Sequence, residues 1–175
     1  MVENDRVMEE KNRFFEELEE EEDLAGDENG NVYLKGDRFN IMASKYFMSE
    51  IMIILEDAYD EKAFEMLFES GKLYGEDLLD LIGEEEEFSS SLGKMLGLLK
   101  FLGYSDSYME MESVVFESTP TAEAYMENQM FSRKACYFLA GILSSVCDRH
   151  EKDKEFREQT CEAEEEGNDC VFVMV

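Results

Sequence analysis

Four cysteines, Cys136, Cys147, Cys161 and Cys170, are the residues of this 175-residue chain best suited to chemistry. The first residues, MVENDRVMEEKNRFFEE, lack the apolar stretch of a signal peptide, and no apolar run approaches the roughly 20 residues of a membrane span. We therefore expect a cytoplasmic protein, in a compartment where thiols stay reduced. Such cysteines are better interpreted as metal ligands or core residues than as disulfides.

Helix geometry limits which cysteines can share one metal ion. The strongly apolar stretch from about Arg133 to Cys147 predicts a helix that carries both Cys136 and Cys147, eleven residues apart. At 1.5 Å per residue their backbones are roughly 16 Å apart, whereas a zinc–sulfur bond is about 2.3 Å long. One of the two must therefore be excluded from any shared site.

Cys161 and Cys170 flank an acidic turn between two predicted strands, which brings their thiols together. Candidates for a further ligand are Glu158 and the only histidine, His150. In a regular strand Glu158 and Cys161 would point to opposite faces, so both can bind one ion only if the strand bends near Gln159–Thr160. The competing interpretation is that the cysteines are buried apolar thiols. His150 lies just beyond a helix end, where the helix dipole explains it, and we assign it no catalytic role.

The elements that must position these residues follow from hydrophobic spacing. Residues 1–30 are predicted to form an acidic helix or a frayed tail, and residues 31–175 a single domain. Within that domain the patterns predict a hairpin (Asn31–Lys35 and Arg38–Met42), helices beginning at Ser44, Asp60 and Glu86, strands near Tyr104–Met111 and Ser113–Ser118, a loop over Thr119–Gln129, the cysteine-bearing helix, and strands over Lys154–Thr160 and Cys170–Val175. Helices in one block with strands around them indicate an α+β fold, an antiparallel sheet packed against a helical layer.

The net charge of −28 excludes several classes of partner. Such a surface repels nucleic-acid phosphates and anionic membranes, and the sixteen Lys and Arg form no basic cluster. No phosphate-binding loop, nucleophile elbow or redox CxxC is present, so an enzymatic role is not favoured. The acidic runs lack the alternating ligands of a calcium loop.

Two further features bear on a ligand site. Gly71 and Gly75 leave one helix face without side chains, which favours close helix packing over room for a ligand. A candidate apolar cavity between helices and sheet would use aromatic side chains as its walls and tyrosine hydroxyls as its polar groups. Its predicted lining is Tyr74, Phe101, Tyr104, Phe116 and Phe156. Taken singly, each is also an ordinary core residue.

The stretches CYFLAGILSSVC and EQTCEAEEEGNDCVFV resemble the C-terminal signature of the 4-vinyl reductase domain family. The matching elements are Cys136, Leu139–Gly141, Glu158–Cys161, Gly167 and Cys170–Val173. Upstream, ESGKLYGEDL is similar to that family's helix with two glycines. The chain departs from the pattern in its long, acidic turn and in Ser144–Ser145, where the family often has glycine.

The resemblance implies an α+β fold related to vesicle-tethering transport-particle subunits and to sensory domains of aromatic-responsive activators. It implies a structural zinc ion held by Cys136, Glu158, Cys161 and Cys170, and it leaves Cys147 out. The first hypothesis is therefore a stand-alone module, a homodimer that binds a small apolar or aromatic ligand. The alternatives are a tetrapyrrole vinyl reductase or its accessory protein, and a homodimeric scaffold without ligand.

Overall fold

A computed structural model of the chain describes residues 4–20, 24–26, 32–34, 37–39, 44–127, 134–164 and 169–175. Its helices are α1 (Asn4–Glu20), α2 (Ser44–Tyr59), α3 (Lys62–Ile82), α4 (Phe88–Phe101), α5 (Pro120–Glu127) and α6 (Tyr137–Arg149). Its strands are β1 (Leu24–Gly26), β2 (Val32–Leu34), β3 (Asp37–Phe39), β4 (Ser107–Glu110), β5 (Ser113–Phe116), β6 (Phe156–Thr160) and β7 (Cys170–Met174). The predicted α+β class is confirmed. Among the described residues no helix is long and apolar enough to cross a membrane.

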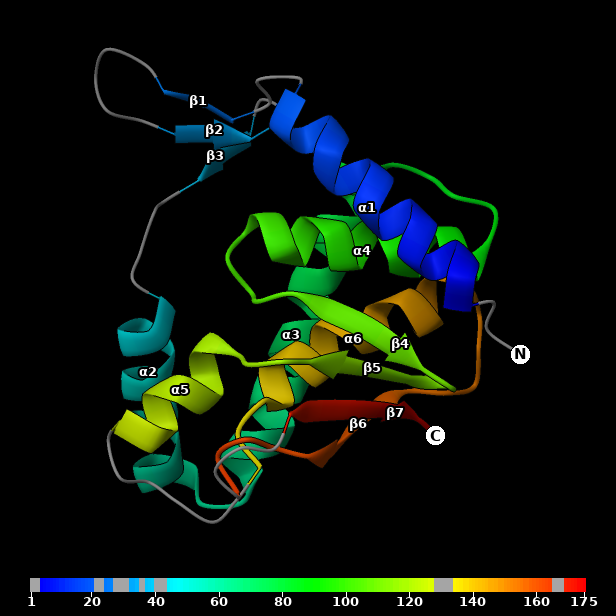
Figure 1. Cartoon of the computed structure of the whole chain (residues 1–175). Helices are drawn as coiled ribbons and strands as arrows, with labels where there is room; N and C mark the ends of the chain where they lie inside the picture. The colour runs from blue at the N-terminus through cyan, green and yellow to red at the C-terminus, as the bar shows by residue number, and fades with distance from the viewer. Residues whose placement is uncertain are drawn as a thin grey trace.

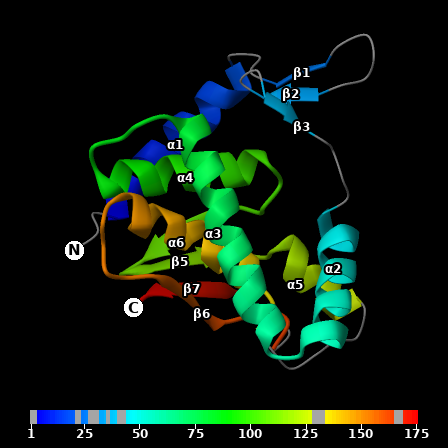
Figure 2. The same cartoon turned by 180° about the vertical axis from the view of Figure 1, so that it is seen from behind.

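The central element is a four-stranded antiparallel sheet in the order β4-β5-β7-β6. Helices α3 and α6 lie behind it in Figure 1 and in front of it in Figure 2. The face toward the helices carries buried side chains from neighbouring strands, including Phe116, Cys170 and Phe172. Ser144 of α6 covers part of the open edge of β6, because the Phe156 N–H donates to its hydroxyl (2.8 Å).

The two predicted helical glycines serve close packing of α3 against α6. A Cβ added to Gly71 would lie 2.1 Å from the Phe138 carbonyl oxygen, and one added to Gly75 would lie 2.3 Å from Ser145 Oγ. From the other helix, a Cβ on Gly141 would lie 2.1 Å from the Phe68 carbonyl oxygen. The backbones meet where side chains are missing, which fixes α6 and its N-terminal cysteine against the rest of the core.

Helix α1 is docked rather than frayed, and it packs on α4 (Figure 1). Gly93 and Gly97 of α4 face its backbone, so this helix pair also approaches through glycine. Lys11, only 1% exposed, donates from α1 to Asp106 Oδ1 and to the Ser107 carbonyl oxygen. The boundary at residue 30 stays a prediction.

Two sequence predictions were wrong, one for residues 119–129 and one for the start of α3. The predicted loop over Thr119–Gln129 contains helix α5, because Pro120 occupies the first helical position, where its missing N–H costs nothing. Asp60 does not cap α3; it adopts a positive φ of 50°, and the helix begins at Lys62. The small sheet β1-β2-β3 contains the predicted hairpin as β2 and β3, while β1 had no sequence signal.

Candidate metal centre

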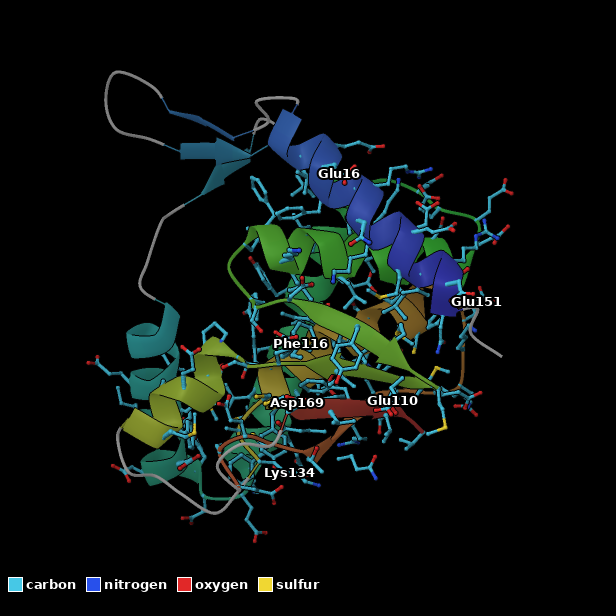
Figure 3. All side chains as sticks on the ribbon, viewed as in Figure 1. Glu16, Glu110, Phe116, Lys134, Glu151 and Asp169 are labelled. Carbon is cyan, nitrogen blue, oxygen red and sulfur yellow. The ribbon has the colours of Figure 1, made fainter. Side chains whose placement is uncertain are left out.

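Three cysteines and one glutamate meet at the end of the sheet nearest α5. The candidate ligand atoms of Cys136, Glu158, Cys161 and Cys170 all lie within 4.8 Å of one another, and all four residues are buried. Cys170 Sγ is 3.9 Å from Cys136 Sγ and 3.9 Å from Cys161 Sγ. Asp169, labelled in Figure 3, precedes Cys170 and marks this end of β7. The structure thus brings together the four residues that the sequence singled out.

A β-bulge makes this convergence possible. Glu158 pairs with Phe172 and Thr160 pairs with Val171, so Gln159 is an extra residue on β6. The extra residue reverses the alternation of side chains, and Glu158 and Cys161 therefore point to the same face of the sheet. The bend predicted near Gln159–Thr160 is present.

Helix α6 supplies the remaining cysteine. Cys136 is the N-cap residue of the helix, and its carbonyl oxygen accepts the N–H of Ala140 (2.9 Å). Its own backbone N–H donates to Glu158 Oε2 (3.0 Å), which holds that carboxyl group in place. Glu158 Oε1 is buried and has no hydrogen-bond partner among the described residues. A buried carboxylate oxygen without a partner is costly, and a cation would satisfy it.

The pKa values in the cluster are shifted by burial and by contacts among its own groups. Burial, with the neighbouring Cys161, raises the pKa of Glu158 to about 9. Hydrogen bonds with Cys161 and Cys170, together with burial, raise the pKa of the Cys136 thiol. Hydrogen bonds from Cys136 and Cys161 lower the pKa of Cys170. Without a cation the cluster therefore favours the charge of one thiolate and resists further ionisation.

The donor set fits a tetrahedral metal ion. Two sulfurs that are each about 2.3 Å from one zinc ion lie about 3.8 Å apart in a tetrahedron, close to the 3.9 Å separations measured here. Three thiolates and one carboxylate complete four-fold coordination with protein atoms alone. Such a closed set is typical of structural rather than catalytic zinc.

Cys147 and His150 lie elsewhere. Cys147 is buried within α6 and is not part of the cluster. His150 follows the last turn of α6, where its Nε2 is 2.7 Å from Ser91 Oγ of α4. Burial lowers the pKa of His150, and Lys152 and Arg149 lower it further, so the ring is neutral near pH 7. The histidine that sequence reasoning set aside thus connects two helices.

Of the five predicted pocket residues, two are fully buried and three are partly buried against the core. Phe116 and Phe156 are fully buried, and Phe116 packs edge-to-face on Phe172 (5.8 Å between centroids). Phe101 is partly buried against the core at the end of α4. Tyr74 of α3 stacks on Phe138 at 5.7 Å. Tyr104 is packed against the core, where burial raises its pKa and Tyr74 and Cys136 raise it further.

Sequence reasoning missed an open groove between α3, the start of α6 and β6. Its volume is about 440 Å³. The rings of Phe64 and Tyr137 stack in it at 4.6 Å, and the Arg157 guanidinium lies 4.8 Å from the Phe68 ring centre. The other lining residues are Glu65, Glu69 and Glu155. The spacing of Phe64 and Phe68 on one helix face was visible in sequence, but their position beside β6 was not.

Comparison with known proteins rests on the fold. No protein-family model matches the chain, and its sequence matches no curated protein. Among solved structures it matches the phenol-responsive sensory domain of the transcription activator PoxR, solved with phenol. The TM-score is 0.72, and the match covers 92% of this chain and 88% of that one at 11% sequence identity.

The chain has the fold of the PoxR sensory domain. At 11% identity the likeness to PoxR establishes architecture alone. The match spans most of both chains, so it includes the order of elements and is not confined to one helix–sheet unit. Within this PoxR-like fold the cysteine cluster joins the start of α6 to the β6–β7 hairpin.

Proposed function

We propose that this chain is a sensory or binding domain of the 4-vinyl reductase type, which holds a small aromatic or apolar molecule and a structural zinc ion. The observation that carries the proposal is the buried cluster of three cysteines and one glutamate within a PoxR-like fold. The ligand set is closed, so the ion would fasten the β6–β7 hairpin to α6 and would leave no position for a reacting water.

The unpartnered Oε1 of Glu158 supports the zinc assignment. The other carboxyl oxygen, Oε2, already accepts the Cys136 N–H, and this bond orients the carboxyl group toward the sulfurs. When bound, zinc would supply positive charge that keeps all three thiols and the carboxyl group ionised. The chain's own residues would act by fixing the ligands: the bulge at Gln159 aligns Glu158 with Cys161, and the glycine contacts between α3 and α6 hold Cys136 in place.

For the small molecule, we propose the neighbourhood of Tyr74 and Tyr104. Both residues are aromatic, they interact with each other, and their hydroxyls offer hydrogen bonds that can orient a ligand. The other predicted lining residues, Phe101, Phe116 and Phe156, supply the apolar wall. PoxR is described as phenol-responsive, and phenol is the natural first probe here.

The proposal is tested by measuring metal and ligand on the same purified protein. We expect one zinc per chain by elemental analysis and native mass spectrometry, and saturable phenol binding by calorimetry. Tyr104→Leu should weaken phenol binding at least tenfold without zinc loss. Tyr108→Leu is the matched control, because Tyr108 lies on the outer side of the sheet and its hydroxyl contacts Asp169.

Four results would contradict parts of the proposal. Protein that takes up no zinc would exclude the metal site. A loss of phenol binding in Phe64→Leu but not in Tyr104→Leu would move the ligand to the groove beside β6. A dimer that binds zinc but neither phenol nor other small aromatic molecules would favour the scaffold, and a spectral change with a divinyl tetrapyrrole and reductant would favour the reductase.

A further inference from the structure

Thr119 connects the cysteine cluster to a helix that contributes no ligand to it. The residue is 1% exposed and lies between β5 and α5. Its hydroxyl oxygen is 3.1 Å from Cys136 Sγ and 3.8 Å from Cys170 Sγ. The same oxygen accepts the backbone N–H of Ala122 (3.1 Å), in the first turn of α5.

These contacts determine where the hydroxyl proton goes. A threonine hydroxyl has one proton and two lone pairs. The Ala122 N–H occupies one lone pair, and the hydroxyl proton is free to point to the nearer sulfur, Cys136, when that sulfur is a thiolate. A metal-bound cysteine is a thiolate and can only accept, and hydrogen bonds to charged acceptors are shorter and stronger than neutral ones. The 3.1 Å contact agrees with such a bond.

Thr119 is also the N-cap of α5. Its carbonyl oxygen accepts the N–H of Glu123 (3.0 Å), while its side chain accepts from Ala122, as N-cap residues do. Helix α5 has only eight residues, and a helix of that length depends on capping and packing because it is marginal alone. The orientation of one hydroxyl therefore serves both the sulfur and the start of this helix.

Helix α5 in turn holds α2. The two helices pack against each other beside the sheet (Figure 1). Tyr125, fully buried on α5, donates its hydroxyl to Glu56 Oε1 of α2 at 2.7 Å. A change at the start of α5 therefore reaches α2 through a short α-helix and a partly buried hydrogen bond.

We propose that Thr119 is a positioning residue that couples the metal centre to the α2–α5 pair. Its hydroxyl donates to the Cys136 thiolate and accepts from the first turn of α5, so metal binding stabilises α5 and, through Tyr125, α2. The inference rests on the proposed function, because it requires a metal ion that holds Cys136 as thiolate.

The test uses two substitutions at Thr119 and one control on the same helix. Thr119→Val keeps the branched shape and removes the hydroxyl, whereas Thr119→Ser keeps the hydroxyl. Thr121→Val removes a hydroxyl from another buried threonine of α5 and serves as the control. Each protein is prepared with zinc, with cobalt in its place, and after treatment with a chelator.

Two readouts separate coupling from general destabilisation. The sulfur-to-cobalt charge-transfer band should move to lower energy in Thr119→Val, because a thiolate that loses a hydrogen bond becomes a stronger donor, and it should stay in place in Thr119→Ser and Thr121→Val. Hydrogen exchange in residues 120–127 should rise about fivefold in zinc-loaded Thr119→Val, as expected for the loss of an N-cap. Exchange in α2 should rise with it, and exchange in α1 and α4 should not.

Wild-type protein gives an independent measurement that needs no substitution. Removal of zinc should increase exchange in α2 and α5 more than in α1 and α4. Zinc-loaded Thr119→Val with wild-type bands and wild-type exchange would overturn the coupling and leave the zinc site standing. Equal increases in all helices on zinc removal would also overturn it. A wild-type protein that binds no zinc would contradict the proposed function and this inference together.

Discussion

The α1–α4 side of the molecule and the β6–β7 end both bury ionisable side chains, but only the first provides their counter-charge. Lys11 is buried beneath α1, and its ammonium is met by Asp106 and by the Ser107 carbonyl oxygen. Asp106 also accepts from Lys100 at 2.9 Å. Burial would raise the pKa of Asp106, but the hydrogen bonds from Lys11, Lys100 and the Ser107 N–H lower it well below its usual range.

The β6–β7 end differs, because its buried acidic groups are not matched by a positive charge among the described residues. It gathers three thiols and one carboxyl group, and within the described residues Glu158 Oε1 has no partner. Burial, with the neighbouring Cys161, raises the pKa of Glu158, and hydrogen bonds with Cys161 and Cys170 raise the pKa of Cys136. The comparison teaches that this chain compensates a buried charge with its own residues where it can. Under the proposed function, the counter-charge of the cysteine cluster is a cation supplied from outside the chain.

Replacing a cysteine of the cluster should have the largest effect. Cys161→Ser should abolish stoichiometric zinc binding and lower the free energy of unfolding by about 4 kcal/mol, since metal loss is among the few causes of such large changes. For a chain of this length, that corresponds to a fall in Tm of roughly 10 °C. Elemental analysis and thermal unfolding measure both effects.

Cys147→Ser is the matched control for this substitution. Cys147 is equally buried, and its replacement places the same hydroxyl in the core, but it is not part of the cluster. It should cost about 1–2 kcal/mol, the penalty of a poorly satisfied hydroxyl, and should retain zinc. Equal losses in the two variants would mean that the cluster is an ordinary part of the core.

Substitutions at the glycine contacts between helices should have the next largest effect on the free energy of unfolding. Gly141→Ala places a Cβ 2.1 Å from the Phe68 carbonyl oxygen, where only backbone movement can make room. We expect a loss of about 3 kcal/mol, the upper part of the range for overpacking. Gly97→Ala, on the α1–α4 side, meets the Lys11 carbonyl oxygen at 2.7 Å and should cost about 1 kcal/mol less. Denaturant unfolding of the two variants tests the ranking, which fails if Gly141→Ala is neutral.

The cysteine end could be predicted from sequence to a useful extent because its signals are local. The two strands and the turn between them brought Cys161 and Cys170 together, and the apolar helix allowed only one of Cys136 and Cys147 to join them. The choice of Cys136 came from the family resemblance. The requirement that Glu158 and Cys161 share a face specified the bend that the bulge at Gln159 provides. The metal assignment itself also needed the family resemblance. The acidic turn residues 165–168, including Gly167, lie outside the described residues.

The α1–α4 side could not be predicted, because its contacts join residues far apart in sequence. Lys11 and Asp106 are separated by 95 positions, and a lysine on an acidic helix gives no sign that it is buried. Helix α5 was missed for a different reason. Pro120 was taken as a loop marker, whereas Thr119 before it is an N-cap that makes proline a good first residue. The same threonine contacts the cluster, so the error concealed a residue of the site.

Removing the buried Lys11 ammonium tests the α1–α4 side, where the chain's own residues supply the counter-charge. Lys11→Met should destabilise the protein by about 2 kcal/mol, less than a fully buried ion pair would, because Asp106 is half exposed and keeps Lys100. Zinc content should not change, since Lys11 contacts the β4 edge of the sheet, two strands away from Cys170 on β7, and contributes no ligand to the cluster. Lys100→Met, which removes the more exposed partner, should cost under about 1 kcal/mol. Loss of zinc in Lys11→Met would contradict the independence of the two regions.

The smallest effect is the pH dependence that Asp106 contributes. Its folded-state pKa is below the ordinary aspartate value of 3.8, so the unfolded chain binds its proton first as the pH falls. The stabilisation is therefore present above that value and is lost as the pH falls through the lower, folded-state pKa. Asp106→Asn should lower Tm slightly at pH 6 and flatten the fall of Tm below about pH 4.

Zinc release in acid would mask this effect, because protons compete with the metal for its ligands. The comparison is therefore best made in the Cys161→Ser background, with and without Asp106→Asn, by thermal unfolding across the acid range. The two Tm curves should converge as the pH falls, since both proteins then lack the Asp106 charge. Parallel curves over the whole range would show that Asp106 carries no pH-dependent stabilisation, and the α1–α4 side would then owe its stability to packing and not to the compensated charge of Lys11.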